Sequence, residues 1–287
     1  MTYTEKAVNF GCTGDWLFGI IAKPETPAIT GVIIIVGGPQ YRAGCHRQFV
    51  LLSRALAAAG HAVLRFDYRG MGDSTGAQRA FTDVSADISA AVDVLQKYVP
   101  SVQHLAFWGL CDGASAALIY CQQAQDSRVS GLCLLNPWVR SEASLARTQV
   151  KHYYTQRLMQ REFWAKLASG KVAGAAVAGL MKNIRSMRQS ASQPAKADLP
   201  FQQRMALAWS TFQGNIFLVL SSEDYTAKEF LEYVRADAAW SGALAHPGLS
   251  RQDVAGADHT FSDLATRTGL ARLTIAWLEN LVLEGKR

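Results

Sequence analysis

A cysteine lies at the centre of the strongest local motif in this sequence. Residues 109–113 read Gly-Leu-Cys-Asp-Gly, directly after a predicted strand and directly before a predicted helix. A turn of the form G-x-nucleophile-x-G holds its central residue in strained backbone angles, so the residues two positions away must be small. The turn also places the Cys111 sulfur near a helix N-terminus, where the partial positive charge favours a thiolate. We therefore take Cys111 as a candidate nucleophile.

A nucleophile of this kind needs a base, and His259 is the best placed of the six histidines. It lies in a loop, residues 256–261, between the last predicted strand and the last predicted helix. His61 and His104 each open a predicted strand, so we interpret them as structural or exposed. His152 falls in a polar helical stretch, where a solvated role or a substrate contact is expected.

The base in turn needs a carboxylate that orients its ring. Two acids, Glu223 and Asp224, follow the predicted strand at 215–220. Asp224 is preferred because its shorter side chain is held more firmly in such a turn, and Glu223 is the alternative. The resulting chain order is nucleophile, acid, histidine, which distinguishes this triad from those of other triad folds.

Acyl transfer also needs hydrogen-bond donors that face the developing oxyanion. One expected donor is the backbone N–H of Asp112, directly after the nucleophile. The other should come from the Gly-Gly-Pro-Gln turn at 37–40, which follows an apolar predicted strand. Proline has no N–H, so Gly38 is the better candidate and Gln40 the second choice. Gln40 and Tyr41 are also candidate substrate contacts on this loop.

Strands and helices alternate along most of the chain, which predicts a parallel sheet with helices on both faces. Strands are predicted at 31–36, 61–66, 104–110, 129–135, 215–220 and 250–254, helices at 46–59, 82–98, 114–125 and 269–283, and a strand pair at 7–24. The alternation stops at 141–209, which looks wholly helical. We predict one α/β domain formed by 1–137 and 210–287, with a helical lid insertion at 138–209 over the carboxyl edge of the sheet.

Composition excludes several classes of protein. Apolar residues make up 49% of the 287 residues and charged residues 18%, as in globular proteins. No apolar stretch is long enough to span a bilayer, and the first residues lack the layout of a signal peptide, so we expect a cytoplasmic protein without stable membrane insertion. Five cysteines without a CxxC pair indicate neither a disulfide framework nor a zinc site. We expect no metal and no organic cofactor, and packing roles for Cys45, Cys121 and Cys133.

Positive charge is concentrated in the predicted insertion. Residues 138–200 contain 11 Lys and Arg but only 3 Asp and Glu, whereas the whole chain carries a net charge of +6. No nucleic-acid-binding motif accompanies this charge, so a nucleic-acid partner is not expected. One interpretation is a solvated helix surface. The other is attraction of an anionic small-molecule acyl substrate, with Arg147 and Lys151 as candidate contacts.

These landmarks, in this order, resemble the α/β-hydrolase superfamily over nearly the whole chain. More narrowly, residues 37–42, 46–49 and 65–73 resemble the exosortase A system-associated hydrolases, type 1. That family is encoded beside machinery for exported polysaccharide and protein sorting in Gram-negative bacteria. The cysteine nucleophile is similar to that of dienelactone hydrolase, which uses Cys-Asp-His chemistry. The sequence departs from the superfamily at Val36, where many members have a histidine before the oxyanion glycine.

The resemblance implies hydrolysis of an ester or thioester through an acyl-enzyme on Cys111. Two alternatives remain at this stage: an acyltransferase with the same triad, and a non-catalytic binding protein on a hydrolase scaffold. We interpret Asp67, Arg69 and Asp73, in the loop after the second parallel strand, as a structural network.

Overall fold

The computed structural model describes residues 2–38, 40–140 and 199–284. The chain divides into two compact units, one formed by Met1–Val139 and Pro200–Arg287 and the other by Arg140–Leu199. Nearly all of the second unit lies outside the described residues, so the first unit is the one described below. The lid predicted at 138–209 falls mostly in the undescribed stretch and remains a prediction.

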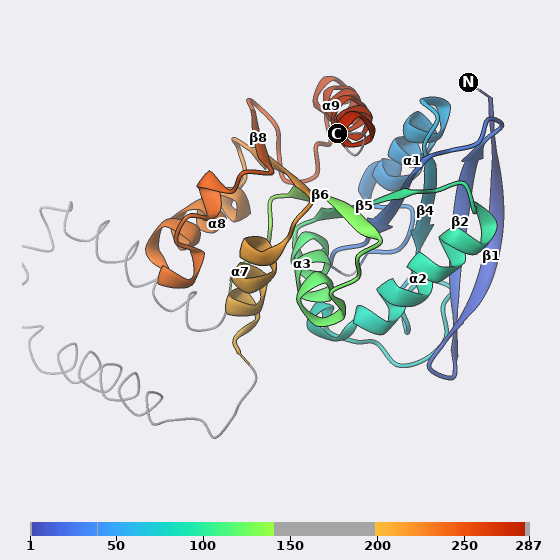
Figure 1. Cartoon of the computed structure of the whole chain (residues 1–287), viewed down its shortest axis with the longest axis horizontal. Coiled ribbons are helices and arrows are strands. Elements are labelled where there is room, and N and C mark those ends of the chain that lie inside the picture. Colours follow the sequence, from blue (N-terminus) through green and yellow to red (C-terminus); the bar gives the residue numbers. More distant parts are fainter. Residues whose placement is uncertain (1, 39, 141–198, 285–287) are drawn as a thin grey trace, which may run out of the picture. The chain divides into compact units, whose positions relative to one another are not determined.

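One sheet of eight strands runs through the first unit (Figure 1). Its order is β1-β2-β4-β3-β5-β6-β7-β8. The strands are β1 (Tyr3–Cys12), β2 (Asp15–Pro24), β3 (Thr30–Ile35), β4 (Ala62–Phe66), β5 (His104–Leu110), β6 (Val129–Leu135), β7 (Asn215–Ser221) and β8 (Leu249–Val254). β1 and β2 pair antiparallel, β2 joins β4 antiparallel, and β3 to β8 are parallel. This confirms the α/β-hydrolase fold class.

Helices cover both faces of the sheet, as the alternating pattern predicts. They are α1 (Gln48–Ala58), α2 (Ser85–Tyr98), α3 (Asp112–Ala124), α7 (Phe201–Thr211), α8 (Tyr225–Ala236) and α9 (Leu264–Glu284). α1 packs with α9 on one face, while α2 and α3 pack together on the other, and α7 lies against α3 (Figure 1). Among the described residues, no helix is both long and apolar enough to cross a membrane.

The central strands are buried on both faces, which explains their continuous apolar runs. All six residues of β3 are buried, and Trp108 and Cys133 at the middle of β5 and β6 are fully buried. Strands with water on neither face cannot alternate polar and apolar residues. Because β5, β6, β7 and β8 are parallel, their carboxyl ends meet at one edge of the sheet. The loops that follow them hold the candidate catalytic residues.

Helix α8 was not predicted from the sequence. An aromatic cluster holds it in place: Trp209 of α7, Phe230 of α8 and Trp240 of the following 3-10 helix (Ala238–Trp240) pack with ring centroids 5.6–6.1 Å apart. The Trp209 indole N–H also donates to the carbonyl of Ala243 at 2.9 Å. α7 therefore packs with the first unit, although the sequence grouped it with the insertion.

Candidate active site

The turn between β5 and α3 has the geometry of a nucleophile elbow. Cys111 has φ 61° and ψ −125°, a strained conformation for a residue with a side chain. A Cβ on Gly109 would lie 2.7 Å from the nitrogen of Ala114, and one on Gly113 would lie 2.4 Å from the carbonyl oxygen of Ile35. Both flanking positions therefore accept only glycine, and the half-buried Cys111 side chain lies at the carboxyl edge of the sheet.

The structure brings Cys111, His259 and Asp224 together from three separate loops. The Nδ1 atom of His259 lies 2.7 Å from Oδ2 of Asp224. The His259 ring is also hydrogen-bonded to the Cys111 side chain. Because Nδ1 faces Asp224, Nε2 is the ring nitrogen left for this contact. This arrangement puts a thiol, an imidazole and a carboxylate in contact.

Asp224 holds its position because it also begins helix α8. Its Oδ1 atom accepts a hydrogen bond from the backbone N–H of Thr226 at 3.0 Å, which is an N-cap contact, while Oδ2 faces His259. Burial alone would raise the pKa of Asp224, but the hydrogen bonds from His259 and from the Thr226 and Ala227 amides lower it. The alternative acid, Glu223, instead accepts a hydrogen bond from Ser222 at 3.1 Å. The carboxylate in contact with the histidine is therefore that of Asp224.

The environment of His259 favours its protonated form. The hydrogen bond with Asp224, followed by the hydrogen bond with Cys111, raises the pKa of His259 to about 10, against the opposing effect of burial. A protonated imidazole between a carboxylate and a sulfur stabilises negative charge on the sulfur. A thiolate beside an imidazolium is the reactive form of a cysteine nucleophile.

Asn136 positions the histidine loop, and sequence reasoning did not identify it as a site residue. This fully buried residue directly follows β6 and donates from Nδ2 to the backbone carbonyl of His259 at 3.3 Å. It also bonds twice to Ser221 at the end of β7. The signal in the sequence was the Asn-Pro pair after β6, which indicated only the end of a strand.

The candidate oxyanion donor Gly38 faces a carboxylate in this structure. Gly38 has φ +63°, and its N–H donates to Oδ1 of Asp112 at 2.5 Å. The Gln40 side chain accepts a hydrogen bond from the Cys45 N–H at 3.2 Å, so it is folded onto its own loop. Tyr41 is exposed. The other two candidate substrate contacts, Arg147 and Lys151, lie outside the described residues.

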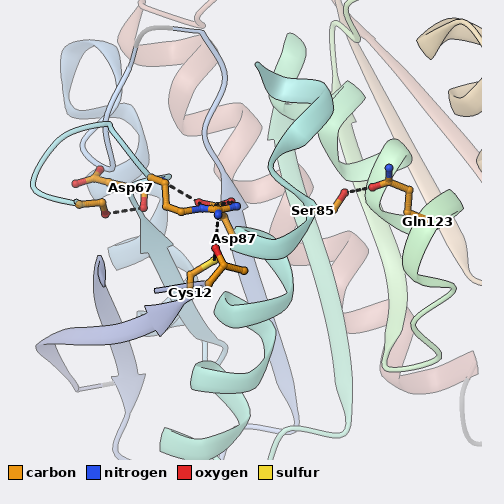
Figure 2. A network of polar contacts seen from close by, with 8 residues as sticks. Cys12, Asp67, Ser85, Asp87 and Gln123 are labelled. Carbon is orange, nitrogen blue, oxygen red and sulfur yellow. Dashed lines mark hydrogen bonds and ion pairs between the residues drawn. The ribbon is translucent and has the colours of Figure 1, made fainter. Parts of the chain in front are cut away.

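A polar network ties this oxyanion loop to the loop after β4. Arg42 donates to Asp67 from its backbone N–H at 2.6 Å and from its guanidinium, which also pairs with Asp73. Arg69 binds Asp87 on α2, with Nη2 2.7 Å from Oδ2, in the cluster around Asp67, Asp87 and Cys12 (Figure 2). These contacts agree with a structural role for Asp67, Arg69 and Asp73.

The remaining cysteines lack the contacts of Cys111. Burial raises the pKa of Cys121 to about 12 and that of Cys133 even further, so both stay protonated. Cys45 is exposed near the oxyanion loop. No group of three His, Cys, Asp or Glu side chains suited to a metal ion occurs in the described part of the chain.

Comparison with known proteins shows the family of the chain and its fold. The sequence profile of a family described as "Serine aminopeptidase, S33" matches residues 27–207. This match spans the oxyanion loop and the nucleophile elbow. No curated protein matches the chain.

Several solved structures share the fold at low sequence identity. An esterase of Pyrococcus furiosus is 15% identical, with a TM-score of 0.63, and the alignment covers 97% of this chain and 93% of that one. A dienelactone hydrolase of Anabaena variabilis is 14% identical, with a TM-score of 0.62 and coverage of 98% and 99%. An α/β serine hydrolase homologue of Coxiella burnetii is 14% identical, with a TM-score of 0.57 and coverage of 96% and 98%. Identities this low establish the fold and not the substrate.

Proposed function

Because the chain belongs to the serine aminopeptidase S33 family of α/β-hydrolases, we propose that it hydrolyses a carboxylic ester or thioester with Cys111 in the nucleophile position. The observation that carries this proposal is the contact of His259 with both Asp224 and Cys111. A cysteine without catalytic function has no need of a histidine that is itself paired with a buried carboxylate.

In the first half of the reaction, the Cys111 thiolate attacks the acyl carbonyl carbon and a C–S bond forms. The carbonyl electron pair moves to oxygen and returns as the bond to the leaving alcohol or thiol breaks. The His259 imidazolium gives its proton to the leaving group. Asp224 keeps the ring oriented and offsets its positive charge throughout.

In the second half, His259 takes a proton from water, and the hydroxide equivalent attacks the acyl-enzyme. The C–S bond breaks, the carboxylic acid leaves, and Cys111 returns as a thiolate beside the imidazolium. During both halves, the backbone N–H groups of Gly38 and Asp112 would hold the oxyanion of the tetrahedral intermediate. No step uses a metal or an organic cofactor.

The experiment is a screen of acyl esters and acyl thioesters with three proteins. The wild-type protein should hydrolyse at least one class of donor, Cys45→Ala should retain most of that activity, and Cys111→Ala should lose it. Cys45 is a matched control because it is an exposed cysteine close to the same loop in the sequence. Equal turnover by Cys111→Ala would exclude Cys111 as the nucleophile.

Two features of the sequence support a substrate class: the basic segment at 138–200 and the family resemblance. The excess of Lys and Arg at 138–200, with Arg147 and Lys151 among them, favours an anionic acyl donor such as a charged saccharide ester. The resemblance to the exosortase A system-associated hydrolases would place such a substrate in the metabolism of exported polysaccharide. A cytoplasmic location belongs to the same proposal.

The salt dependence of catalysis tests the anionic substrate. Attraction by surface charge weakens as ionic strength rises. The value of kcat/KM for an anionic donor should therefore fall with added salt, while that of a neutral donor of the same acyl length should not. If both donors respond alike, the basic segment does not select the substrate.

A further inference from the structure

The oxyanion hole assigned above already contains a negatively charged group. Oδ1 of Asp112 accepts the Gly38 N–H at 2.5 Å, and the carboxylate also accepts hydrogen bonds from the backbone amides of Asp112 and Gly113. Gly38 and Asp112 are the two donors that would hold the oxyanion of a substrate. The Asp112 side chain therefore uses the hydrogen bonds that catalysis needs.

The Asp112 carboxylate lies where the elbow and the oxyanion loop pack closely together. A Cβ on Gly37 would lie 2.5 Å from Oδ1 of Asp112, and one on Gly113 would lie 3.1 Å from the nitrogen of Gly37. The glycine at 37 therefore leaves room for the Asp112 oxygen, and the glycine at 113 lets the elbow approach the backbone of residues 35–37 closely. Burial raises the pKa of Asp112 against the lowering effect of the three amides, so the carboxylate is held where water does not fully solvate it.

A carboxylate oxygen and the oxyanion of a tetrahedral intermediate cannot share this position. They would overlap, and their like charges would repel strongly in a partly buried site. The Asp112 side chain must therefore leave before a substrate carbonyl can enter. A carboxylate that leaves a buried position needs another hydrogen-bond donor, because an unpaired buried charge is costly.

The buried hydroxyl of Tyr68 is available as a donor of this kind. It finds no hydrogen-bond partner among the residues that the structure describes. Burial, followed by the negative charges of Asp112 and Asp87, raises the pKa of Tyr68 well above its usual value. The tyrosine therefore remains protonated and able to donate.

We propose that Asp112 is a displaceable occupant of the oxyanion hole and that the Tyr68 hydroxyl receives its carboxylate when a substrate carbonyl enters. Asp112 then acts as a selectivity element: a substrate binds productively only if its contacts offset the cost of moving the carboxylate. This inference rests on the proposed function. It adds a resting state in which the Asp112 carboxylate fills the oxyanion hole, and it names Tyr68 as the residue that receives this carboxylate.

The test uses a trifluoromethyl ketone, which forms a tetrahedral adduct with a cysteine and so needs the oxyanion hole. Iodoacetamide serves as the second probe, since its displacement at carbon forms no oxyanion. For Asp112→Ala we expect the affinity for the ketone to rise about tenfold or more, because no carboxylate has to move. Asp112→Asn should lie between that variant and the wild type, because it keeps the shape without the charge.

Tyr68→Phe should have the opposite effect, lowering the affinity for the ketone about threefold in the wild-type background. In the Asp112→Ala background it should have no effect, because there is no carboxylate to receive. Tyr120→Phe is the matched control: Tyr120 is also a buried tyrosine, but its hydroxyl bonds Asp126, away from the active site. That variant should alter the melting temperature and leave the affinity for the ketone unchanged.

Two outcomes would overturn the inference. One is an unchanged or lower affinity for the ketone in both Asp112 variants while Cys111 still reacts with iodoacetamide. The other is an equal effect of Tyr68→Phe in both backgrounds, which would make the tyrosine structural. If Cys111 of the wild-type protein reacts with neither probe, the proposed function itself fails and this inference falls with it, so the two failures can be told apart.

Discussion

Asn136 and Ser221 are joined by two hydrogen bonds that lock the ends of neighbouring strands together. The Nδ2 atom of Asn136 donates to the Ser221 hydroxyl at 2.9 Å, and the Ser221 backbone N–H donates to Oδ1 of Asn136, also at 2.9 Å. The same Nδ2 reaches the carbonyl of His259. One fully buried side chain thus links β6, β7 and the loop that carries the base, three segments far apart in the sequence.

Replacing Asn136 should therefore weaken both the fold and the site. Asn136→Ala leaves the buried Ser221 amide without a partner, at a cost of about 1–3 kcal/mol in the free energy of unfolding. The left-handed backbone at this position, φ +43°, adds about 1 kcal/mol for alanine. Urea denaturation measures the total. Asn136→Asp keeps the acceptor for the Ser221 amide but buries a carboxylate against the His259 carbonyl oxygen, so it should be destabilised as well. An unchanged free energy of unfolding in either variant would contradict this assignment.

The pH dependence of kcat/KM should report the paired state of His259. Its pKa is raised from 6.5 to about 10, chiefly by Asp224, so the imidazolium persists through neutral pH. A raised pKa stabilises the folded protein fully below pH 6.5, and this stabilisation is lost as the pH rises toward about 10. Because the imidazolium protonates the leaving group, kcat/KM should fall only in that alkaline range. A fall near pH 7 would show that the histidine is not paired as described.

Asp224→Asn should lower activity and move the alkaline fall in kcat/KM to lower pH. The amide cannot offset the charge of the imidazolium and favours the wrong tautomer, and the analogous change in a serine triad costs about 10⁴ in kcat. Losing the largest contribution to the raised pKa of His259 then shifts the alkaline limb downward. Glu223→Gln is the matched control and should change neither, because Glu223 contacts Ser222 instead. A larger effect of Glu223→Gln would reverse the assignment of the acid.

Gly37→Ala and Gly38→Ala form a pair that tests how the oxyanion loop is packed. A Cβ on Gly37 would lie 2.3 Å from the carbonyl oxygen of Leu110, which belongs to the backbone and cannot give way. A Cβ on Gly38 meets nothing within 4 Å, although φ +63° makes it strained by about 1 kcal/mol. Thermal unfolding should therefore show a much larger loss for Gly37→Ala. Equal losses would mean that the loop does not pack against the elbow.

The sequence predicted the parts of the molecule that local patterns determine. Alternating strands and helices follow from apolar runs, and the elbow follows from the glycines at 109 and 113. Helix α8 was missed because Asp224, the residue that begins it, was interpreted only as part of the loop after a strand. In the structure Asp224 both caps the helix and contacts His259.

The remaining features depend on contacts between distant parts of the chain. Asn136 bonds a residue 85 positions away, and the Asp112 side chain bonds Gly38, which is 74 positions away. No local pattern indicates which buried polar groups will meet across a sheet. Sequence reasoning therefore assigned the backbone of Asp112 to the oxyanion hole without revealing that its side chain would bond the Gly38 N–H.

The most direct measurement is mass spectrometry of the protein trapped during turnover of an activated ester or thioester at acidic pH, where deacylation is slow. We predict that an acyl group is found on Cys111 and that the Cys111→Ala protein carries none. In the His259→Ala protein, the acyl group should accumulate with a donor activated strongly enough to acylate the cysteine. We further predict that this adduct, in the wild-type protein, decays at the rate of product release. An acyl group found on Cys45 or on a serine, with Cys111 unmodified while product continues to form, would contradict the claim that Cys111 is the nucleophile.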